Sequence, residues 1–210
     1  MEDELLYRYY YYLCNCESII TNLILNIIKE NTNENDSVYL AGLKNNIKSK
    51  ESFENKCNRN DRIFPKIFYI YDILRYTIIL PVEFFYNKYV LILNSFKNKG
   101  IEIFRVKNTW IHFDKDIPYR GINVLLYYKN SIVFEVQFHT LESYNANMST
   151  HNFYEELLKC YDPKRVQDIK YRLYKYVRSI KTPHGVYNIS EYKNEKELLD
   201  RIIEYSKNLL

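Results

Sequence analysis

The chain has 210 residues, 47% of them hydrophobic and 27% charged, with a formal net charge of +4. This composition can build one domain with a substantial core, and it excludes disordered, collagen-like and low-complexity chains. The acidic start, the lack of a long apolar run and four cysteines without a CxxC pair predict a soluble cytoplasmic protein with reduced thiols and no membrane partner.

In the first half of the chain, helical and strand-like periodicities alternate between polar or glycine-containing breaks. Ser49 is a candidate N-cap for the helix that follows it, and Gly100 is a candidate helix stop. The expected elements are a helix over residues 4–30, a loop over 31–37, a strand over 38–42, a helix over 49–56, a strand over 70–80, a helix over 86–98 and a strand over 101–107.

In the second half, residues 129–131 have the composition of a hairpin loop, and Pro163 stands where a first helical position is expected. The expected elements are strands over 123–128 and 132–139 and helices over 145–159, 163–181 and 194–208, with a break at 183–185. This order of elements predicts an α+β fold. We expect one domain over 1–210, with an N-terminal helix over 1–30, a catalytic core over 38–160 and C-terminal helices over 163–210.

Three short segments carry polar residues that packing alone does not require. The first, residues 42–56, brings four lysines to the end of a strand and the start of a helix. Backbone amides at a helix start attract anions, and lysines add point charges for phosphate. The segment is a candidate phosphate site, and a solvated surface helix is the alternative.

The second segment places Asp72 inside an apolar strand, three residues before Arg75. A buried carboxylate is costly unless it is paired or bound to a metal. Asp72 is a candidate Mg²⁺ ligand, because this ion prefers carboxylates together with substrate phosphates. An ion pair of Asp72 with Arg75 or with another residue is the alternative.

The third segment joins residues 119–123 to the strand that follows them. Period-2 alternation puts Glu135, Gln137 and His139 on one face of that strand. Such a polar series is typical of a solvent-facing strand, or of a cleft floor whose carboxylate binds a metal or acts as a general base.

Together these segments resemble the synthetase domain of the RelA/SpoT family. That family combines a basic segment with Ser and Lys, an Asp followed by an Arg on a strand, a Tyr-Arg motif, a Glu-x-Gln-x-x-Thr strand and a His-x-x-Tyr pair on the next helix. The matching residues occur in the same order here. They are Lys48, Ser52, Lys56, Asp72, Arg75, Tyr119, Arg120, Glu135, Gln137, Thr140, His151 and Tyr154.

The resemblance implies a nucleotidyltransferase-like fold, with a mixed central sheet flanked by helices, and a pyrophosphokinase activity. Such enzymes move the β,γ-pyrophosphate of ATP to the ribose 3′-hydroxyl of an acceptor nucleotide. The resemblance also implies that Asp72 and Glu135 bind Mg²⁺, that Glu135 can instead act as a base, and that Arg75 assists the transfer. The implied ATP-binding residues are Lys48, Ser52 and Lys56. The implied acceptor-binding residues are Lys107, Tyr119, Arg120, Asn123, Gln137 and His139, with Tyr119 stacked on the base. His151 and Tyr154 would be structural or line the cleft.

Four positions depart from the family pattern. Asn123 stands in place of the family's histidine, His139 in place of an arginine and Asn108 in place of an aspartate, and Asn46 stands where a basic-segment arginine is expected. These changes leave the phosphotransfer residues in place and bear on the choice of acceptor. The chain therefore resembles a divergent branch that includes broad-specificity and toxin-like enzymes.

The helix expected over 163–181 is strongly basic. It carries seven lysines and arginines against one acidic residue, Asp168, and it interleaves tyrosines at 171, 174 and 176. This is typical of a nucleic-acid surface, or of a solvated helix whose tyrosines lie in the core. Because toxic family members modify the tRNA 3′ end, tRNA is an alternative acceptor. A third reading is an inactive nucleotide-binding module, against which the intact Asp72 and Glu135 argue. The sequence leaves the oligomeric state and any antitoxin open.

Overall fold

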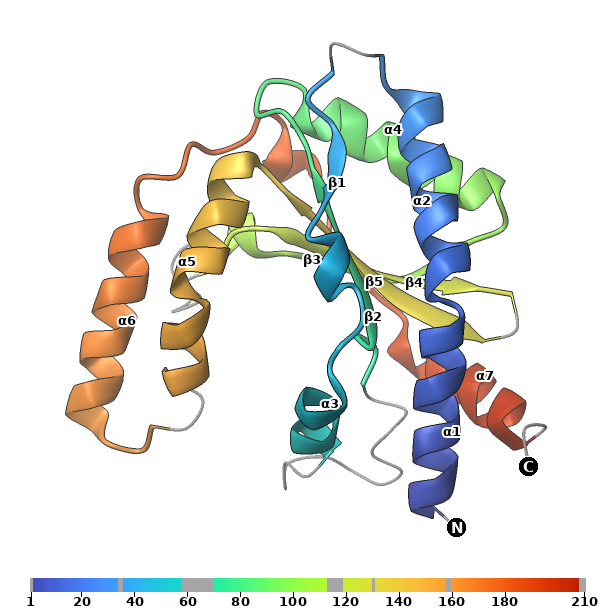
Figure 1. Ribbon diagram of the computed structural model, residues 1–210. Coiled ribbons are helices and arrows are strands. Elements are labelled where there is room, and N and C mark those ends of the chain that lie inside the picture. Colours follow the sequence, from blue (N-terminus) through green and yellow to red (C-terminus); the bar gives the residue numbers. More distant parts are fainter. Residues whose placement is uncertain are drawn as a thin grey trace.

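The computed structural model describes residues 2–33, 36–57, 70–112, 119–129, 131–157 and 160–207, which form a six-stranded mixed sheet with helices on both faces (Figure 1). This confirms the expected α+β fold. The strands are β1 (Tyr39–Ala41), β2 (Leu74–Ile79), β3 (Glu102–Asn108), β4 (Ile122–Tyr128), β5 (Ile132–His139) and β6 (Tyr192–Lys193). The helices are α1 (Glu2–Asn15), α2 (Glu17–Asn31), α3 (Lys50–Cys57), α4 (Phe85–Asn98), α5 (Leu141–Leu157), α6 (Pro163–Val177) and α7 (Glu195–Lys207), with 3₁₀ turns η1 (Leu43–Asn45), η3 (Thr109–Ile111) and η4 (Val186–Asn188).

The strand order of the sheet is β1-β2-β5-β4-β3-β6. β2 and β5 pair in parallel, and the other neighbouring strands pair antiparallel. The register sets Arg75 of β2 opposite Glu135 of β5, and Gln137 of β5 opposite Asn123 of β4. Side chains from segments far apart in the sequence are thereby aligned on one face, because directly paired residues share a face of the sheet.

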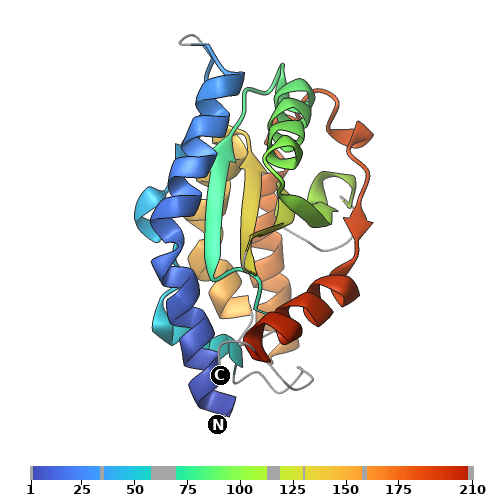
Figure 2. The same cartoon turned by 90° about the vertical axis from the view of Figure 1, so that its right-hand side faces the viewer.

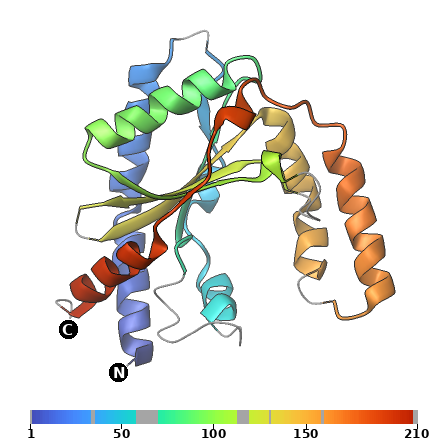
Figure 3. The same cartoon turned by 180° about the vertical axis from the view of Figure 1, so that it is seen from behind.

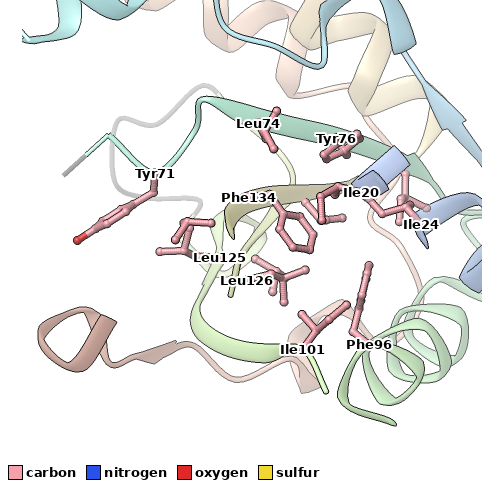
Figure 4. Packing of buried hydrophobic residues seen from close by; sticks show 14 of the residues in the cluster. Ile20, Ile24, Tyr71, Leu74, Tyr76, Phe96, Ile101, Leu125, Leu126 and Phe134 are labelled. Atoms are coloured by element: carbon pink, nitrogen blue, oxygen red, sulfur yellow. The ribbon is translucent and has the colours of Figure 1, made fainter. Parts of the chain in front are cut away.

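One face of the sheet is apolar and supports most of the helices. The ring centroids of Tyr76 and Phe134 lie 6.2 Å apart on neighbouring strands, and Phe96 of α4 lies 6.3 Å from Phe134. Ile20 and Ile24 of α2 extend this layer (Figure 4). Figure 2 shows α1, α2, α4 and α7 in front of the sheet on this side. Burying each such large apolar side chain stabilises the fold by roughly 1.5–3 kcal/mol.

The other face of the sheet meets α5, which begins directly after β5 and packs along α6 (Figure 3). α6 begins where the sequence predicts, because the Asp162 side chain accepts a hydrogen bond from the Lys164 amide at 3.0 Å and Pro163 follows at the first helical position. The four cysteines are free thiols, as expected. Within the described ranges, no helix combines the length and the apolar character needed to cross a membrane.

Two local expectations are wrong, and one segment holds elements that the sequence does not predict. The helix expected over 4–30 is divided at Cys16, beside the point where the Tyr76 hydroxyl donates a hydrogen bond to the Glu17 carbonyl at 3.1 Å. Asp72 lies in a turn before β2 rather than within a strand, although its neighbour Ile73 is fully buried. The segment after residue 183 contains η4 and β6, which are too short to leave a periodic signal. Residues 158–159 and 208, at the ends of two expected helices, lie outside the described residues.

Candidate active site

The sheet face opposite the apolar layer carries a polar row formed by Arg75, Glu135, Gln137, Asn123 and Lys107. Arg75 pairs with Glu135 across β2 and β5, Gln137 pairs with Asn123 across β5 and β4, and Asn123 pairs with Lys107 across β4 and β3. Neighbouring strands lie about 4.8 Å apart, so these side chains form one continuous polar surface across four strands. The structure thus brings together five of the residues singled out in the sequence.

Glu135 is the buried centre of the polar row, with an exposed fraction of 6%. Its Oε1 accepts a hydrogen bond from Gln137 Nε2 at 2.8 Å, and its Oε2 lies 3.3 Å from Arg105 Nη2. The Arg105 guanidinium also lies over the Tyr71 ring, 5.9 Å from its centroid. Two partners therefore fix the orientation of the carboxylate. A solvent-facing strand, the alternative for this segment, is excluded because every residue of β5 is buried.

Sequence reasoning missed Arg105. It lies two residues before Lys107 on β3, so strand alternation places both on the same face. That signal was available, but the contact with Glu135 depends on the strand pairing that sets Arg105 opposite Leu125 of β4 and Leu125 opposite Glu135 of β5, which no sequence pattern shows.

Asp72 lies between two lysines at the start of β2. Its Oδ1 is 2.5 Å from Lys56 Nζ and its Oδ2 is 3.1 Å from Lys48 Nζ. Burial acts to raise the pKa of Asp72, but the charges of Lys56 and Lys48 outweigh burial and hold the pKa well below its ordinary value. An ion pair was the alternative to a metal-binding role for Asp72, and among the described residues its partners are these two lysines rather than Arg75.

The helix that carries Lys56 is held by a cap and by α1. The Ser49 side chain accepts a hydrogen bond from the Ser52 amide at 3.2 Å, which confirms Ser49 as the N-cap, and Ser52 itself is exposed. The Tyr10 hydroxyl donates to the Lys48 carbonyl at 2.9 Å, and the Tyr10 and Phe53 rings lie 4.7 Å apart. Contacts from α1 therefore set where the two lysines stand.

Beside the polar row, Tyr119 joins the strand residues Asn123 and His139. The Tyr119 hydroxyl donates to Asn123 Oδ1 at 2.7 Å and lies 2.8 Å from His139 Nε2. His139 is fully buried, and its Nδ1 lies 3.0 Å from Ser143 Oγ on α5. Burial lowers the pKa of His139 to about 4, although a backbone hydrogen bond with Arg120 acts in the opposite direction. This end of the site is therefore uncharged at neutral pH.

The remaining expected site residues lie elsewhere. Arg120 is buried, and its Nη1 donates to the backbone carbonyls of Tyr119 at 3.1 Å and Thr109 at 3.4 Å, so it braces the backbone. His151 is exposed on α5. The side chain of Tyr154 lies outside the described part of the structure.

The carboxylates of the site are suited to a metal ion that is held partly by the substrate. Among the residues that the structure describes, no group of three or more His, Cys, Asp or Glu could hold a metal ion. Asp72 before β2 and Glu135 on the neighbouring β5 nevertheless supply hard oxygen donors. Because Mg²⁺ is usually bound by one or two carboxylates plus substrate phosphates and water, the site fits a Mg²⁺ that arrives with a nucleotide.

No protein-family model matches the sequence, and no curated protein matches it. Solved structures match in fold. A GTP pyrophosphokinase family protein from Streptococcus pneumoniae aligns with a TM-score of 0.58 at 17% identity, over 99% of this chain and 93% of that chain. Small alarmone synthetase 1 from Bacillus subtilis, bound to its product pppGpp, aligns with a TM-score of 0.57 at 15% identity, over 99% and 96%. A chain of the complex between the Type VI effector Tas1 and its immunity protein aligns with a TM-score of 0.52 at 20% identity, over 83% and 97%.

Proposed function

Since the chain has the fold of the RelA/SpoT-like small alarmone synthetases, we propose that it is a pyrophosphokinase that transfers pyrophosphate from ATP to the 3′-hydroxyl of a nucleotide. The observation that carries the proposal is the polar row, with buried Glu135 at its centre and Asp72 between two lysines. Phosphoryl transfer needs cations around the phosphates and a group that accepts the hydroxyl proton. The site provides both on one scaffold.

The cationic part of the site is proposed to bind ATP. Lys48 and Lys56 are within reach of the same carboxylate, Asp72, and Arg75 extends the positive charge toward Glu135. Phosphate oxygens can replace the Asp72 carboxylate as partners of the two ammonium groups, since lysines bind phosphates as point charges. Asp72 would hold Mg²⁺, which supplies charge neutralisation on the phosphates, and Glu135 would be a second ligand only where it does not act as the base.

The part of the site around Tyr119 is proposed to bind the acceptor. The Tyr119 ring can stack on a base, while Asn123 and Gln137 offer hydrogen bonds and exposed Lys107 offers charge for acceptor phosphates. The 3′ oxygen then bonds to the β-phosphorus of ATP, the bond from that phosphorus to the α-phosphate oxygen breaks, AMP leaves and Glu135 takes the hydroxyl proton. The product pppGpp on the Bacillus subtilis protein supports a nucleotide as acceptor.

The test is a label-transfer assay. The purified protein is incubated with γ-labelled ATP and Mg²⁺ and, separately, with GDP, GTP, unlabelled ATP or bulk tRNA. We expect label on one nucleotide, with one AMP formed for each labelled product. Label released only as inorganic phosphate, or no AMP with any acceptor from folded protein, would refute the proposal.

A second candidate acceptor is tRNA, and the surface of α6 favours it. Tyr171 is 73% exposed and Tyr176 is 47% exposed, so these tyrosines are not core residues and can stack on bases. Asp168, the acidic residue of this helix, pairs with Arg165 and Arg172, while Lys175 is exposed. Label on tRNA in the same assay would identify this activity. Either acceptor places the reaction in the cytoplasm of its own cell or, for a delivered effector, of a target cell.

A further inference from the structure

Tyr119 contacts His139, a buried residue that has no role in the proposed reaction. His139 is fully buried beneath Tyr119, so it cannot touch a nucleotide directly. Its ring meets the Tyr119 ring edge-on, with centroids 5.3 Å apart and an angle of 87° between the planes. Tyr119 and Tyr144 are the titratable side chains whose rings contact it. Of the groups that contact His139, the Tyr119 side chain is the one proposed to meet the acceptor, so His139 would act on the acceptor through Tyr119.

The hydrogen bonds assign the proton on the His139 ring. Asn123 Oδ1 receives the Tyr119 hydroxyl proton, so the Tyr119 oxygen is left to accept from His139 Nε2–H. On the other side of the ring, Ser143 Oγ accepts from the Thr140 amide at 3.1 Å, and its own proton has two acceptors within reach, His139 Nδ1 at 3.0 Å and the Thr140 carbonyl at 3.2 Å. Because a neutral ring with its proton on Nε2 has a bare Nδ1, the nearer of these two acceptors is open to the Ser143 hydroxyl. The four side chains then form one directional chain, from Ser143 through His139 and Tyr119 to Asn123.

We propose that His139, held by Ser143 as the neutral Nε2–H tautomer, is a positioning residue that fixes the Tyr119 hydroxyl and thereby the ring that meets the acceptor. The low pKa of His139 is consistent with this role, because an imidazolium could not accept from Ser143. Because the Tyr119 hydroxyl is already hydrogen-bonded, Tyr119 can contact an acceptor base only through the face of its ring. The inference deepens the proposed function and, for its effect on the acceptor, rests on it.

Gly121 makes room for this arrangement. A Cβ atom at position 121 would lie 2.7 Å from His139 Cε1 and 2.8 Å from the Tyr119 hydroxyl, closer than such contacts occur. A side chain there would separate the two rings. The close approach of Tyr119 to His139 therefore depends on the lack of a side chain at Gly121 as well as on the hydrogen bonds.

The tautomer is tested without any assay of activity. The chain has four histidines, so ¹⁵N-labelled histidine side chains give few signals, and a His139→Gln variant identifies those of His139. We expect a protonated Nε2 and an unprotonated Nδ1 at pH 7, and loss of this preference in Ser143→Ala. A protonated Nδ1, or a doubly protonated ring, would refute the inference and leave the proposed function untouched.

The positioning role is tested by steady-state kinetics with the acceptor found in the label-transfer assay. Removing one hydrogen bond from a buried chain predicts a rise of about tenfold in KM for the acceptor in Ser143→Ala, with KM for ATP unchanged. Ser149→Ala, an exposed position on the same helix, is the matched control. His139→Gln keeps a donor toward Tyr119 and should restore most of the acceptor affinity that His139→Leu loses.

The outcomes separate the two proposals. If Ser143→Ala lowers the melting temperature but leaves KM for the acceptor at the wild-type value, His139 is structural only and the inference fails. If the wild-type protein transfers no pyrophosphate, the proposed function fails, and the ¹⁵N spectrum still decides the tautomer.

Discussion

Replacing Glu135 by glutamine tests the centre of the site with little change in shape. Glutamine cannot accept a proton from a 3′-hydroxyl and brings no charge to Arg105 or to a metal. Loss of a positioned general base slows reactions by about 10²–10⁴-fold. We therefore expect turnover to fall by at least about 100-fold, which corresponds to about 2.7 kcal/mol of lost transition-state stabilisation.

The expected cost in folding stability is smaller than the cost in activity. Arg105 lies 3.3 Å from Glu135, but its side chain is 26% exposed, so water can solvate the guanidinium in the variant. A hydrogen bond to a charged group contributes about 1.5–3 kcal/mol, and the amide of glutamine keeps part of it. We expect a loss of about 1 kcal/mol, which lowers Tm by about 2–4 °C in a domain of this size.

AMP release under single-turnover conditions and a thermal melt measure the two quantities on the same preparation. Glu102→Gln is the matched control, because Glu102 is an exposed residue of β3 that pairs with Arg201. Turnover near the wild-type value in Glu135→Gln would remove Glu135 from the reaction. A fall in Tm of about 10 °C or more would show instead that its role is structural.

Two further predictions concern Asp72 and α6. Because the folded-state pKa of Asp72 lies below its ordinary value of 3.8, the stability that this carboxylate contributes is present above about pH 4 and is lost as the pH falls toward the folded-state pKa. Asp72→Asn should lower the urea midpoint at pH 7 and flatten its decline between about pH 5 and pH 2; an unchanged slope would contradict the ion pairs with the two lysines. Reversing the charges of Arg172 and Lys175 should abolish labelling of tRNA and spare free nucleotides, and a variant that keeps both activities would exclude α6 as a tRNA surface.

Local chemistry made much of the fold predictable. Pro163 and its preceding cap mark the start of α6, and Gly100, with its φ of 75°, follows the end of α4. The turn between β4 and β5 was readable from composition. The pairing of β2 with β5 was not readable, because a parallel partner about 60 positions away leaves no signal in either segment. The register that aligns Arg75 with Glu135 therefore came only from the structure.

For the candidate site, too, the sequence predicted some of the residues but not their contacts. Strand alternation and the RelA/SpoT resemblance found Glu135 and Gln137, but they could not show which cations contact which carboxylates. The resemblance implied that Arg120 binds the acceptor together with Tyr119. In an extended segment, adjacent side chains point to opposite faces, and the structure buries Arg120 against the backbone instead.

The contacts between α1 and α3 have a consequence for how the site can change over evolutionary time. α3 has eight residues, too few to persist as an isolated helix in water. Its place depends on the hydroxyls of Tyr10, which reaches the Lys48 carbonyl from 38 positions earlier, and of Tyr7, which donates to Glu54 at 2.6 Å. Substitutions in this tyrosine-rich helix can therefore change the ATP affinity that we propose for the site, while every residue proposed to contact the nucleotide stays the same.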